Sequence, residues 1–427
     1  MKPLYRCALT VLLLLPAVGC SAQPVVPVVG DVELAEDFLE IIETLAAEEM
    51  EGRDAGTAGV ELARYYLIGR FQAAGLEPGF VIEGEPSYSQ PFEITTGADA
   101  EGQPIKVVTQ NVGGLVPGVG PLADQVIVVG GHYDHVGYGY YGSRSRASGT
   151  IHPGADDNAS GTAGVVLLAE QWAAYVEANP DTPRRTVFFT GFAGEERGLL
   201  GSRYMVSKPE EWPFELDALA GMINMDMIGR LSGNELYLFG DKTGEQWRAW
   251  TVQANQELGL GLDLKLDVPA PGGSDHSMFI AVGCPSIFFN TWLHDDYHTP
   301  NDTAEKINAS GGAVVVTLVG ALLQKAATTD ERLVYVAPPP PAPRPVLGVQ
   351  IDRGGEGVRV TAVVEGGPAA QAGLAVGDLI LSLDEAELSS PGELRREIRR
   401  HEPGDEVTLV IMRGEAKMEL KVTLGRR

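Results

Sequence analysis

Gln125-Val126-Ile127-Val128-Val129-Gly130-Gly131-His132-Tyr133-Asp134-His135 is the stretch that decides the fold of the larger part of this chain. Its first half is almost uninterruptedly apolar, which is typical of a strand buried on both faces. Between this run and the next, Gly161–Val176 carries apolar residues at helical spacing. A strand, a helix and a strand in succession predict an α/β domain with a mixed, largely parallel sheet flanked by helices. The later runs that also read as buried strands are Thr186–Phe189, Met222–Met225, Glu235–Phe239 and Ser286–Phe289.

Acidic and imidazole side chains follow these strands at the points where the apolar runs end. Because the carboxyl ends of parallel strands meet at one edge of a sheet, we expect these side chains to lie together there. Clustered carboxylates repel one another unless a positive charge sits among them, and imidazole with carboxylate suits a pair of Zn²⁺ ions, although Mn²⁺ or Co²⁺ also fits. The residues concerned are His132, Asp134, Asp156, Asp157, Glu195, Glu196, Asp226 and His298.

Several motifs occur together and in the order found in one enzyme family. From about Val32 to Asp330 the chain resembles the M28 family of zinc aminopeptidases. The resemblance implies the zinc exopeptidase fold, two Zn²⁺ per chain, and hydrolysis of the N-terminal residue from peptides with a free N-terminus. The matching stretches are Glu51–Thr57, His132–Asp134, Gly154–Gly161, Gly194–Ser202, Asn224–Arg230, Ser274–His276 and Tyr297–Thr303.

The resemblance also implies a role for each matching residue. Glu195 would be the general base that takes a proton from a metal-activated water. Asp134 would orient the His132 ring, and Asp157 would have a geometric role beside the bridging ligand. The expected metal ligands are His132 and Asp226 for one zinc, Glu196 and His298 for the other, and Asp156 as the bridge between them.

Other polar residues near these motifs receive plainer interpretations. His135, His152 and His294 are expected at the surface or rim of the site, and packing explains His276 at least as well as catalysis does. The loop from Tyr138 to Arg146 is rich in glycine and tyrosine. We expect it to form part of the substrate rim.

The C-terminal part is expected to be a separate small domain. A proline-rich linker over residues 331–345 precedes it, and the peptidase domain is expected over residues 32–330. Residues 346–427 resemble a PDZ domain, a small β-barrel-like fold, on segments that include Gly366–Ile380. The resemblance implies capture of a C-terminal peptide as an added strand by Leu347, Gly348 and Val349, with the amides of the Leu347-Gly348 turn available for its carboxylate. The alternative is a module that only packs on the peptidase domain.

The N-terminus reads as an export signal. Residues 1–19 carry Lys2 and Arg6 ahead of a short apolar stretch, and the segment before Cys20 resembles a bacterial lipobox. We therefore expect a leader over residues 20–31 and a protein of the bacterial cell envelope, anchored to a membrane by a lipid on Cys20. A secretory signal cut near Ala22 is the alternative, with a secreted or periplasmic product.

Composition excludes one class of partner. The 427 residues include Asp+Glu 58 against Lys+Arg 32, a formal net charge of −26. Such a chain repels a phosphate backbone, so nucleic acid is not expected as a partner.

Three alternative functions stay open at this point. An M28-like carboxypeptidase would use the same ligands, whereas a glutaminyl cyclase uses one zinc, which the full dinuclear ligand set disfavours. The third is a non-catalytic, peptide-binding lipoprotein. The presence of Glu195 and every expected ligand argues against lost catalysis.

Overall fold

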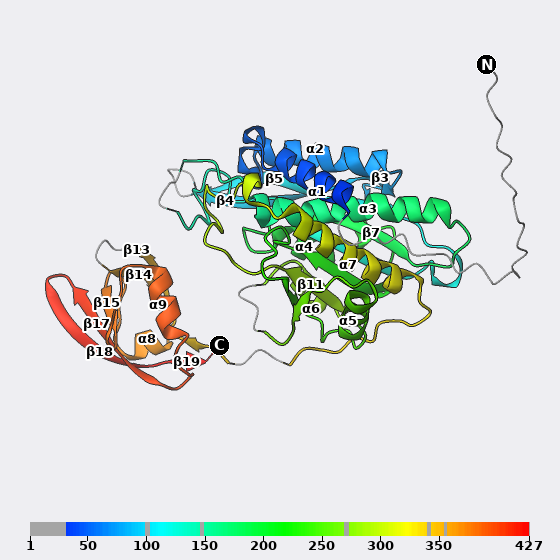
Figure 1. Cartoon of the computed structure of the whole chain (residues 1–427). Helices are drawn as coiled ribbons and strands as arrows, with labels where there is room; N and C mark the ends of the chain where they lie inside the picture. Colours follow the sequence, from blue (N-terminus) through cyan, green and yellow to red (C-terminus); the bar gives the residue numbers. More distant parts are fainter. Residues whose placement is uncertain are drawn as a thin grey trace, which may run out of the picture. The chain divides into compact units, whose positions relative to one another are not determined.

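The structure, a computed structural model, describes residues 31–98, 103–145, 149–268, 273–339, 343–353 and 357–426. The chain divides between Pro338 and Pro339 into two compact units, each with its own sheet (Figure 1). The expected signal segment, with Cys20, lies outside the described residues.

The first unit combines helices with one large sheet. Its helices are α1 (Val32–Leu45), α2 (Ala58–Ala73), α3 (Gly161–Ala178), α4 (Leu200–Ser207), α5 (Trp247–Glu257), α6 (His276–Ala281) and α7 (Ala309–Thr328). Its strands are β1 (Glu77–Pro78), β2 (Phe80–Ile82), β3 (Glu85–Ser87), β4 (Ser89–Ala98), β5 (Pro104–Val116), β6 (Val126–His132), β7 (Thr186–Phe192), β8 (Leu219–Met225), β9 (Glu235–Phe239), β10 (Asp263–Lys265) and β11 (Ser286–Asn290).

The large sheet is mixed, with a parallel centre. Its strand order is β1-β5-β7-β6-β8-β11-β9-β10, and β4 pairs with β5 outside this path. The neighbours β7, β6, β8 and β11 run parallel, whereas β5 is antiparallel to β7 and β9 is antiparallel to β11. The predicted fold class is therefore confirmed, and the carboxyl ends of the four parallel strands lie at one edge.

The central strands are apolar throughout because both faces of the sheet are covered. Ile127 and Val129 of β6 belong to a core shared with α1, α3 and α7. Val126 and Val128, which point to the opposite face, belong to a second core that includes residues of α4 and α6. Helix α3 packs against both α1 and α2 (Figure 1). Cys284 is buried in the second core, as its apolar surroundings in the sequence suggest.

Helix α7 has the length and mean hydropathy, 1.4, of a membrane span. In that window, however, 67% of the residues are buried inside the unit, where α7 packs against α1, α3 and α5. It is therefore a core helix of this unit. Its first turn is capped by Asn308, whose side chain accepts a hydrogen bond from the Gly311 amide at 2.9 Å.

Two features differ from the sequence-based expectation. The long hairpin of β4 and β5 was not predicted, because its strands mix polar and small residues with apolar ones. The chain also stays on the first unit beyond residue 330: Leu333 is buried in its core, and the Val336 amide donates to the Thr243 carbonyl at 2.8 Å. Part of the expected linker thus packs as part of the first unit.

The second unit, over its described residues, is a small β domain with two helices. Its main sheet has the order β13-β14-β15-β17-β18, and α9 begins with a capping box between Ser390 and Glu393. A separate core, which includes Leu394 and Ile411, supports it. Its elements are β12 (Pro345–Val346), β13 (Val349–Arg353), β14 (Val358–Val363), α8 (Pro368–Gln371), β15 (Leu379–Leu383), β16 (Ala386–Glu387), α9 (Pro391–Ile398), β17 (Glu406–Arg413), β18 (Ala416–Thr423) and β19 (Gly425–Arg426).

Candidate metal centre

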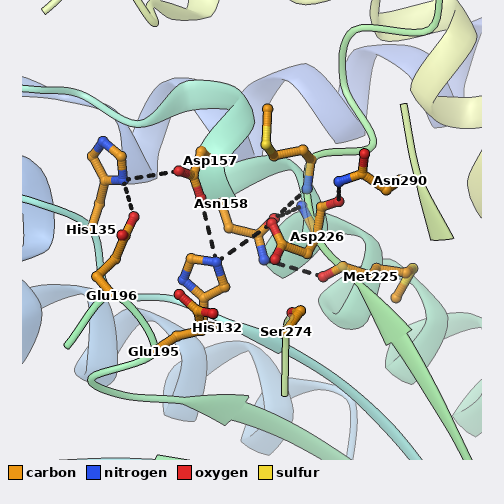
Figure 2. Close-up of polar contacts among 12 residues, drawn as sticks. His132, His135, Asp157, Asn158, Glu195, Glu196, Met225, Asp226, Ser274 and Asn290 are labelled. Carbon is orange, nitrogen blue, oxygen red and sulfur yellow. Dashed lines mark hydrogen bonds and ion pairs between the residues drawn. The ribbon is translucent and has the colours of Figure 1, made fainter. Parts of the chain in front are cut away.

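The polar residues that follow the parallel strands meet at one edge of the large sheet (Figure 2). His132 is the last residue of β6, and Glu195 and Glu196 follow β7. Asp226 follows β8, and His298 lies in the segment after β11. The expectation that these side chains gather is met because the strands that precede them are neighbours in the sheet.

One group of possible metal donors contains His132, Asp157 and Asp226. The Nε2 atom of His132 lies 3.4 Å from Asp157 Oδ1 and 3.5 Å from Asp226 Oδ1. The far nitrogen of the ring, Nδ1, lies 3.1 Å from the Asp134 carbonyl oxygen. A main-chain partner of this kind fixes the orientation of a ligating imidazole.

Asp134 contributes to the site in two ways. Its carbonyl oxygen is closer to His132 Nδ1 than its carboxylate is, since Oδ1 of the carboxylate is 3.7 Å away. The same Oδ1 accepts a hydrogen bond from the Glu195 amide at 3.1 Å. Burial raises the pKa of Asp134 to about 7, against the opposing effect of His132. Asp134 therefore links the first strand end to the backbone of Glu195.

A second group of possible donors contains His135, Asp157, Glu196 and His298. His298 Nε2 lies 3.0 Å from Asp157 Oδ2 and 3.0 Å from Glu196 Oε2. The His298 ring is oriented at its far nitrogen, Nδ1, by the Gly142 carbonyl oxygen at 2.9 Å. Asp157 belongs to both groups and turns one carboxylate oxygen toward each.

The prediction that Asp156 bridges the two groups is wrong; Asp157 occupies that place. Both residues lie in the distorted helical turn Ala155–Ser160, but their side chains point in different directions. Asp156 Oδ1 accepts hydrogen bonds from the Gly229 amide at 2.7 Å and the Ser160 hydroxyl at 3.0 Å. Its Oδ2 lies 3.1 Å from Nε2 of His294. The Asp156 carboxylate is thus engaged with the protein away from the donor groups.

Two features of the donor groups fit metal ions: the types of ligand atom they offer, and the buried polar atoms that have no hydrogen-bond partner. Imidazole nitrogens and carboxylate oxygens are ligands that zinc takes in proteins. Asp157 Oδ2 and His298 Nε2 are buried and 3.0 Å apart, yet neither has a hydrogen-bond partner among the described residues. Buried polar atoms are costly when they are unpaired, and a shared cation would satisfy both.

Glu195 stands beside the donor groups without belonging to either. Burial raises the pKa of its carboxyl well above the ordinary value; the Glu196 and Asp226 carboxylates add to the increase and His132 opposes it. A carboxylate that belongs to neither donor group but lies next to both has the position of a general base.

A small cavity of about 130 Å³ opens onto this part of the site. His132, Asp157, Glu195 and Asp226 line its polar side. The remaining lining residues, which are mainly apolar, are Met227, Gly273, Phe288, Asn290, Leu293 and Tyr297.

Arg53 holds the loops that carry the donors, a role that sequence reasoning did not assign. It is completely buried, and its guanidinium donates to the carbonyl oxygens of Tyr133, Pro153 and Gly154 at 2.8 Å each. Burial lowers its pKa to about 10, which Asp157 partly offsets. The motif around Arg53 was visible in the sequence, but its partners are main-chain atoms, which no residue pattern indicates.

The histidines expected at the rim are mostly interior. His135 and His152 are fully buried, and only His294 is partly exposed, so the surface interpretation is wrong for the first two. His135 enters the second donor group, and His152 Nε2 lies 2.7 Å from the Ser143 hydroxyl. His276 stacks on the cavity residue Phe288, with 4.7 Å between ring centroids, which favours its packing interpretation.

The loop that begins at Tyr138 lies differently from the expectation. None of its described residues lines the cavity, although Tyr140 and Tyr141 are exposed. Gly142 orients His298, and the Arg144 amide donates to the His298 carbonyl oxygen at 3.0 Å. The loop therefore supports a donor, and its function at a substrate rim stays a hypothesis.

Comparison with known proteins agrees with this geometry. Residues 111–323 match the model of peptidase family M28, and residues 345–424 match that of the PDZ domain. Leupeptin-inactivating enzyme 1 from Streptomyces exfoliatus is 27% identical over 267 residues, 62% of this chain and 51% of that protein. Aminopeptidase YwaD from Bacillus subtilis is 29% identical over 209 residues, 47% of this chain and 41% of that protein. The chain thus spans about half the length of these relatives or less.

Solved structures show the same fold. The aminopeptidase from Aneurinibacillus sp. strain AM-1 superposes with a TM-score of 0.52 at 19% identity, covering 72% of this chain and 96% of that one. Glutaminyl cyclase from Porphyromonas gingivalis superposes with a TM-score of 0.53 at 19% identity, covering 68% and 98%. At such identities the likeness establishes the zinc exopeptidase fold alone. By its family match and its fold, the chain belongs to peptidase family M28 through its first unit and carries a PDZ domain in its second.

Proposed function

We propose that the protein is a zinc aminopeptidase that removes apolar N-terminal residues from peptides. The observation that carries the proposal is the pair of donor groups joined by Asp157, with the unligated Glu195 beside them at a cavity. His132, Asp157 and Asp226 would hold one ion, and Asp157, Glu196 and His298 the other. When bound, zinc lowers the pKa of a water molecule and polarises a carbonyl group.

The cavity favours an amino terminus over a carboxyl terminus. Its described lining includes the carboxylates of Asp157, Glu195 and Asp226 and contains no lysine or arginine. Carboxylates attract the ammonium group of a free N-terminus, whereas a C-terminal carboxylate needs a cationic partner. Phe288 and Leu293 provide an apolar wall for the side chain of the residue to be removed.

Glu195 would perform the proton transfers of hydrolysis. It accepts a proton from the attacking water and then delivers that proton to the nitrogen of the leaving amine. Its main chain is fixed by the Asp134 carboxylate at 3.1 Å, which keeps the Glu195 side chain directed at the cavity. Glu195→Gln keeps the shape of the side chain and removes the basic oxygen.

Mass spectrometry of peptide digests tests the proposal. The zinc-loaded protein is incubated with one leucine-initiated peptide in free and N-acetylated forms, and with a peptide that begins with glutamine. Stepwise loss of residues from the free peptide alone is the expected result. Glu195→Gln should abolish it, while Glu210→Gln, an exposed glutamate on the same β7–β8 connection, should not. Trimming from the carboxyl end, or cyclisation of the glutamine without cleavage, would refute the aminopeptidase assignment.

We propose that the PDZ unit binds an extended C-terminal peptide along β13. Among the described residues, β13 is paired only with β14, so its other edge is open to an added strand. Gly348 has a positive φ of 77°, and the amides of Leu347 and Gly348 have no acceptor within the described residues. Free amides at such a turn can receive a carboxylate.

Peptide binding to the full chain tests this second proposal. Val349 is half-buried on β13, and Val376 is an exposed valine elsewhere in the unit. Val349→Asp should weaken binding of fluorescent peptides with apolar C-termini at least roughly tenfold because it places a charge beside the peptide. Val376→Asp is the matched control. Equal binding by both variants would refute the β13 site.

We further propose export to the bacterial cell envelope and a lipid anchor on Cys20. The lipobox-like segment before Cys20 supports it.

A further inference from the structure

His135 brings a second imidazole to one side of the metal centre. It is fully buried, and its Nδ1 atom lies 3.0 Å from Glu196 Oε1 and 3.7 Å from Asp157 Oδ2. The His135 and His298 rings meet edge to face, with centroids 5.5 Å apart. Its Nε2 atom is buried and has no partner among the described residues. Among the described residues, the ring is therefore hydrogen-bonded through Nδ1, which faces Glu196, and not through Nε2.

The distances between imidazole and carboxylate donors on this side are close to the edges of a zinc tetrahedron. Bonds of 2.0–2.2 Å at tetrahedral angles place neighbouring donors about 3.4 Å apart. His298 Nε2 is 3.0 Å from Asp157 and 3.0 Å from Glu196, and His135 Nδ1 is 3.0 and 3.7 Å from the same carboxylates. Glu196 turns Oε1 to His135 and Oε2 to His298, and one donor atom from each of the four residues lies within 4.8 Å of the other three.

The opposite side of the centre has three donors and faces the cavity. His132, Asp157 and Asp226 line the cavity, whereas His135, Glu196 and His298 do not. A closed set of four ligands is typical of a structural zinc, and three ligands with an open position are typical of a catalytic one. The two sides of the metal centre therefore differ in the number of protein donors and in whether they open to the cavity.

We propose that His135 is a fourth protein ligand, which makes the ion among His135, Asp157, Glu196 and His298 a tightly held, structural one. The ion among His132, Asp157 and Asp226 keeps the open position beside Glu195. The inference rests on the proposed metal centre and deepens it. Its consequence is ordered loading, in which the four-donor side fills first and survives chelation longest.

Stepwise zinc affinity measures this difference without reference to activity. The full chain is equilibrated with zinc buffers of graded free concentration, and native mass spectrometry counts the bound ions. We expect two steps separated by at least about tenfold in free zinc. His135→Ala should weaken the tighter step by roughly 10–100-fold, while His276→Gln, which alters a buried histidine outside both groups, should leave both steps unchanged.

A second variant separates ligation from hydrogen bonding. His135→Asn can still donate a hydrogen bond to Glu196 but offers zinc no imidazole nitrogen, so it should behave as the alanine variant does. With one equivalent of Co²⁺, the wild type should show the intense visible absorption of a tetrahedral site, and both variants should lose intensity. Thermal unfolding of the metal-free proteins shows that each variant is folded.

The outcomes keep this inference apart from the proposed function. Wild-type affinity in His135→Asn, or two equal steps that His135→Ala leaves unchanged, would overturn the fourth ligand while the metal centre stands. Failure of the wild type to bind zinc at all would overturn the metal centre itself.

Discussion

If Asp157 is the shared ligand, its substitution should affect zinc binding more than the same substitution of its neighbour Asp156. We consider Asp157→Asn and Asp156→Asn, which remove one negative charge each from adjacent residues of the same turn. Asp157 turns one carboxylate oxygen to each donor group, so its loss affects both ions. We expect zinc affinity in Asp157→Asn to fall by at least roughly 100-fold, more than the loss of an outer-shell partner costs.

Asp156→Asn should instead lower stability and retain zinc. Its Oδ1 accepts two buried hydrogen bonds, which an asparagine oxygen can still accept, whereas the ionic contact of Oδ2 with His294 is lost. Hydrogen bonds to charged groups contribute about 1.5–3 kcal/mol, so the free energy of unfolding should fall by about 1–3 kcal/mol. In a domain of this size each kcal/mol lowers the melting temperature by roughly 2–4 °C.

Two measurements on each variant decide the matter. Bound zinc is counted by elemental analysis after equilibration in a zinc buffer, and the unfolding temperature of the metal-free protein is measured by calorimetry. Asp157→Asn should lose zinc, whereas Asp156→Asn should keep zinc and unfold at a lower temperature than the wild type. Zinc lost from Asp156→Asn but retained by Asp157→Asn would refute the geometric argument and restore the assignment made from sequence.

Further predictions concern the loops, acid stability and export. Arg53→Met should lower the free energy of unfolding by about 3–5 kcal/mol in chemical denaturation, because it leaves the carbonyl oxygens of four residues without their donor; a loss below about 1 kcal/mol would contradict its structural role. Burial lowers the pKa of His276 to about 3, so the unfolded chain binds more protons between about pH 3 and 6.5, and stability is lost as the pH falls through that range. His276→Gln should reduce the loss of unfolding free energy at pH 4.5 by roughly 2–3 kcal/mol. Chemical denaturation of both proteins at pH 4.5 and 7.5 measures this difference, and the same pH dependence of stability in the variant and the wild type would contradict the prediction. Cys20→Ala should move the protein from the membrane fraction to the soluble fraction, and a wild type found only in the soluble fraction would exclude the lipid anchor.

The strands that the sequence predicted best are those buried on both faces, where mainly apolar residues fit. The predicted Glu235–Phe239 coincides with β9, and the other predicted runs lie within or overlap β6, β7, β8 and β11. These strands have cores on both faces, so apolar residues persist without interruption. The β4–β5 hairpin escaped prediction because β5 changes along its length from exposed residues to buried ones. Its composition is therefore that of neither a surface strand nor a core strand.

The candidate site could be located from sequence but not resolved into atoms. Every strand end that carries a donor was identified because the position of a residue after a parallel strand determines the edge on which it lies. The choice between Asp156 and Asp157 depends on which way each side chain leaves a distorted turn. There Asp157 has φ −104° and ψ 97°, outside the helical region. Residue type and spacing are nearly the same for two adjacent aspartates, so only the local backbone distinguishes them.

The direction of the His135 side chain could not be predicted from sequence either. Three positions separate it from His132, and the intervening chain has left the strand, so period-two alternation no longer predicts which way the ring points. Its direction is determined by contacts from distant segments: the His135 amide donates to the Arg53 carbonyl oxygen at 3.1 Å, and Arg53 in turn binds the carbonyl oxygens on both sides of the donor loop. A buried cation thus shapes the main chain that aims an imidazole at Glu196. That coupling passes through main-chain carbonyl groups, which every residue has, so the pattern of side-chain types does not indicate it. A ligand of this kind is therefore found from geometry alone.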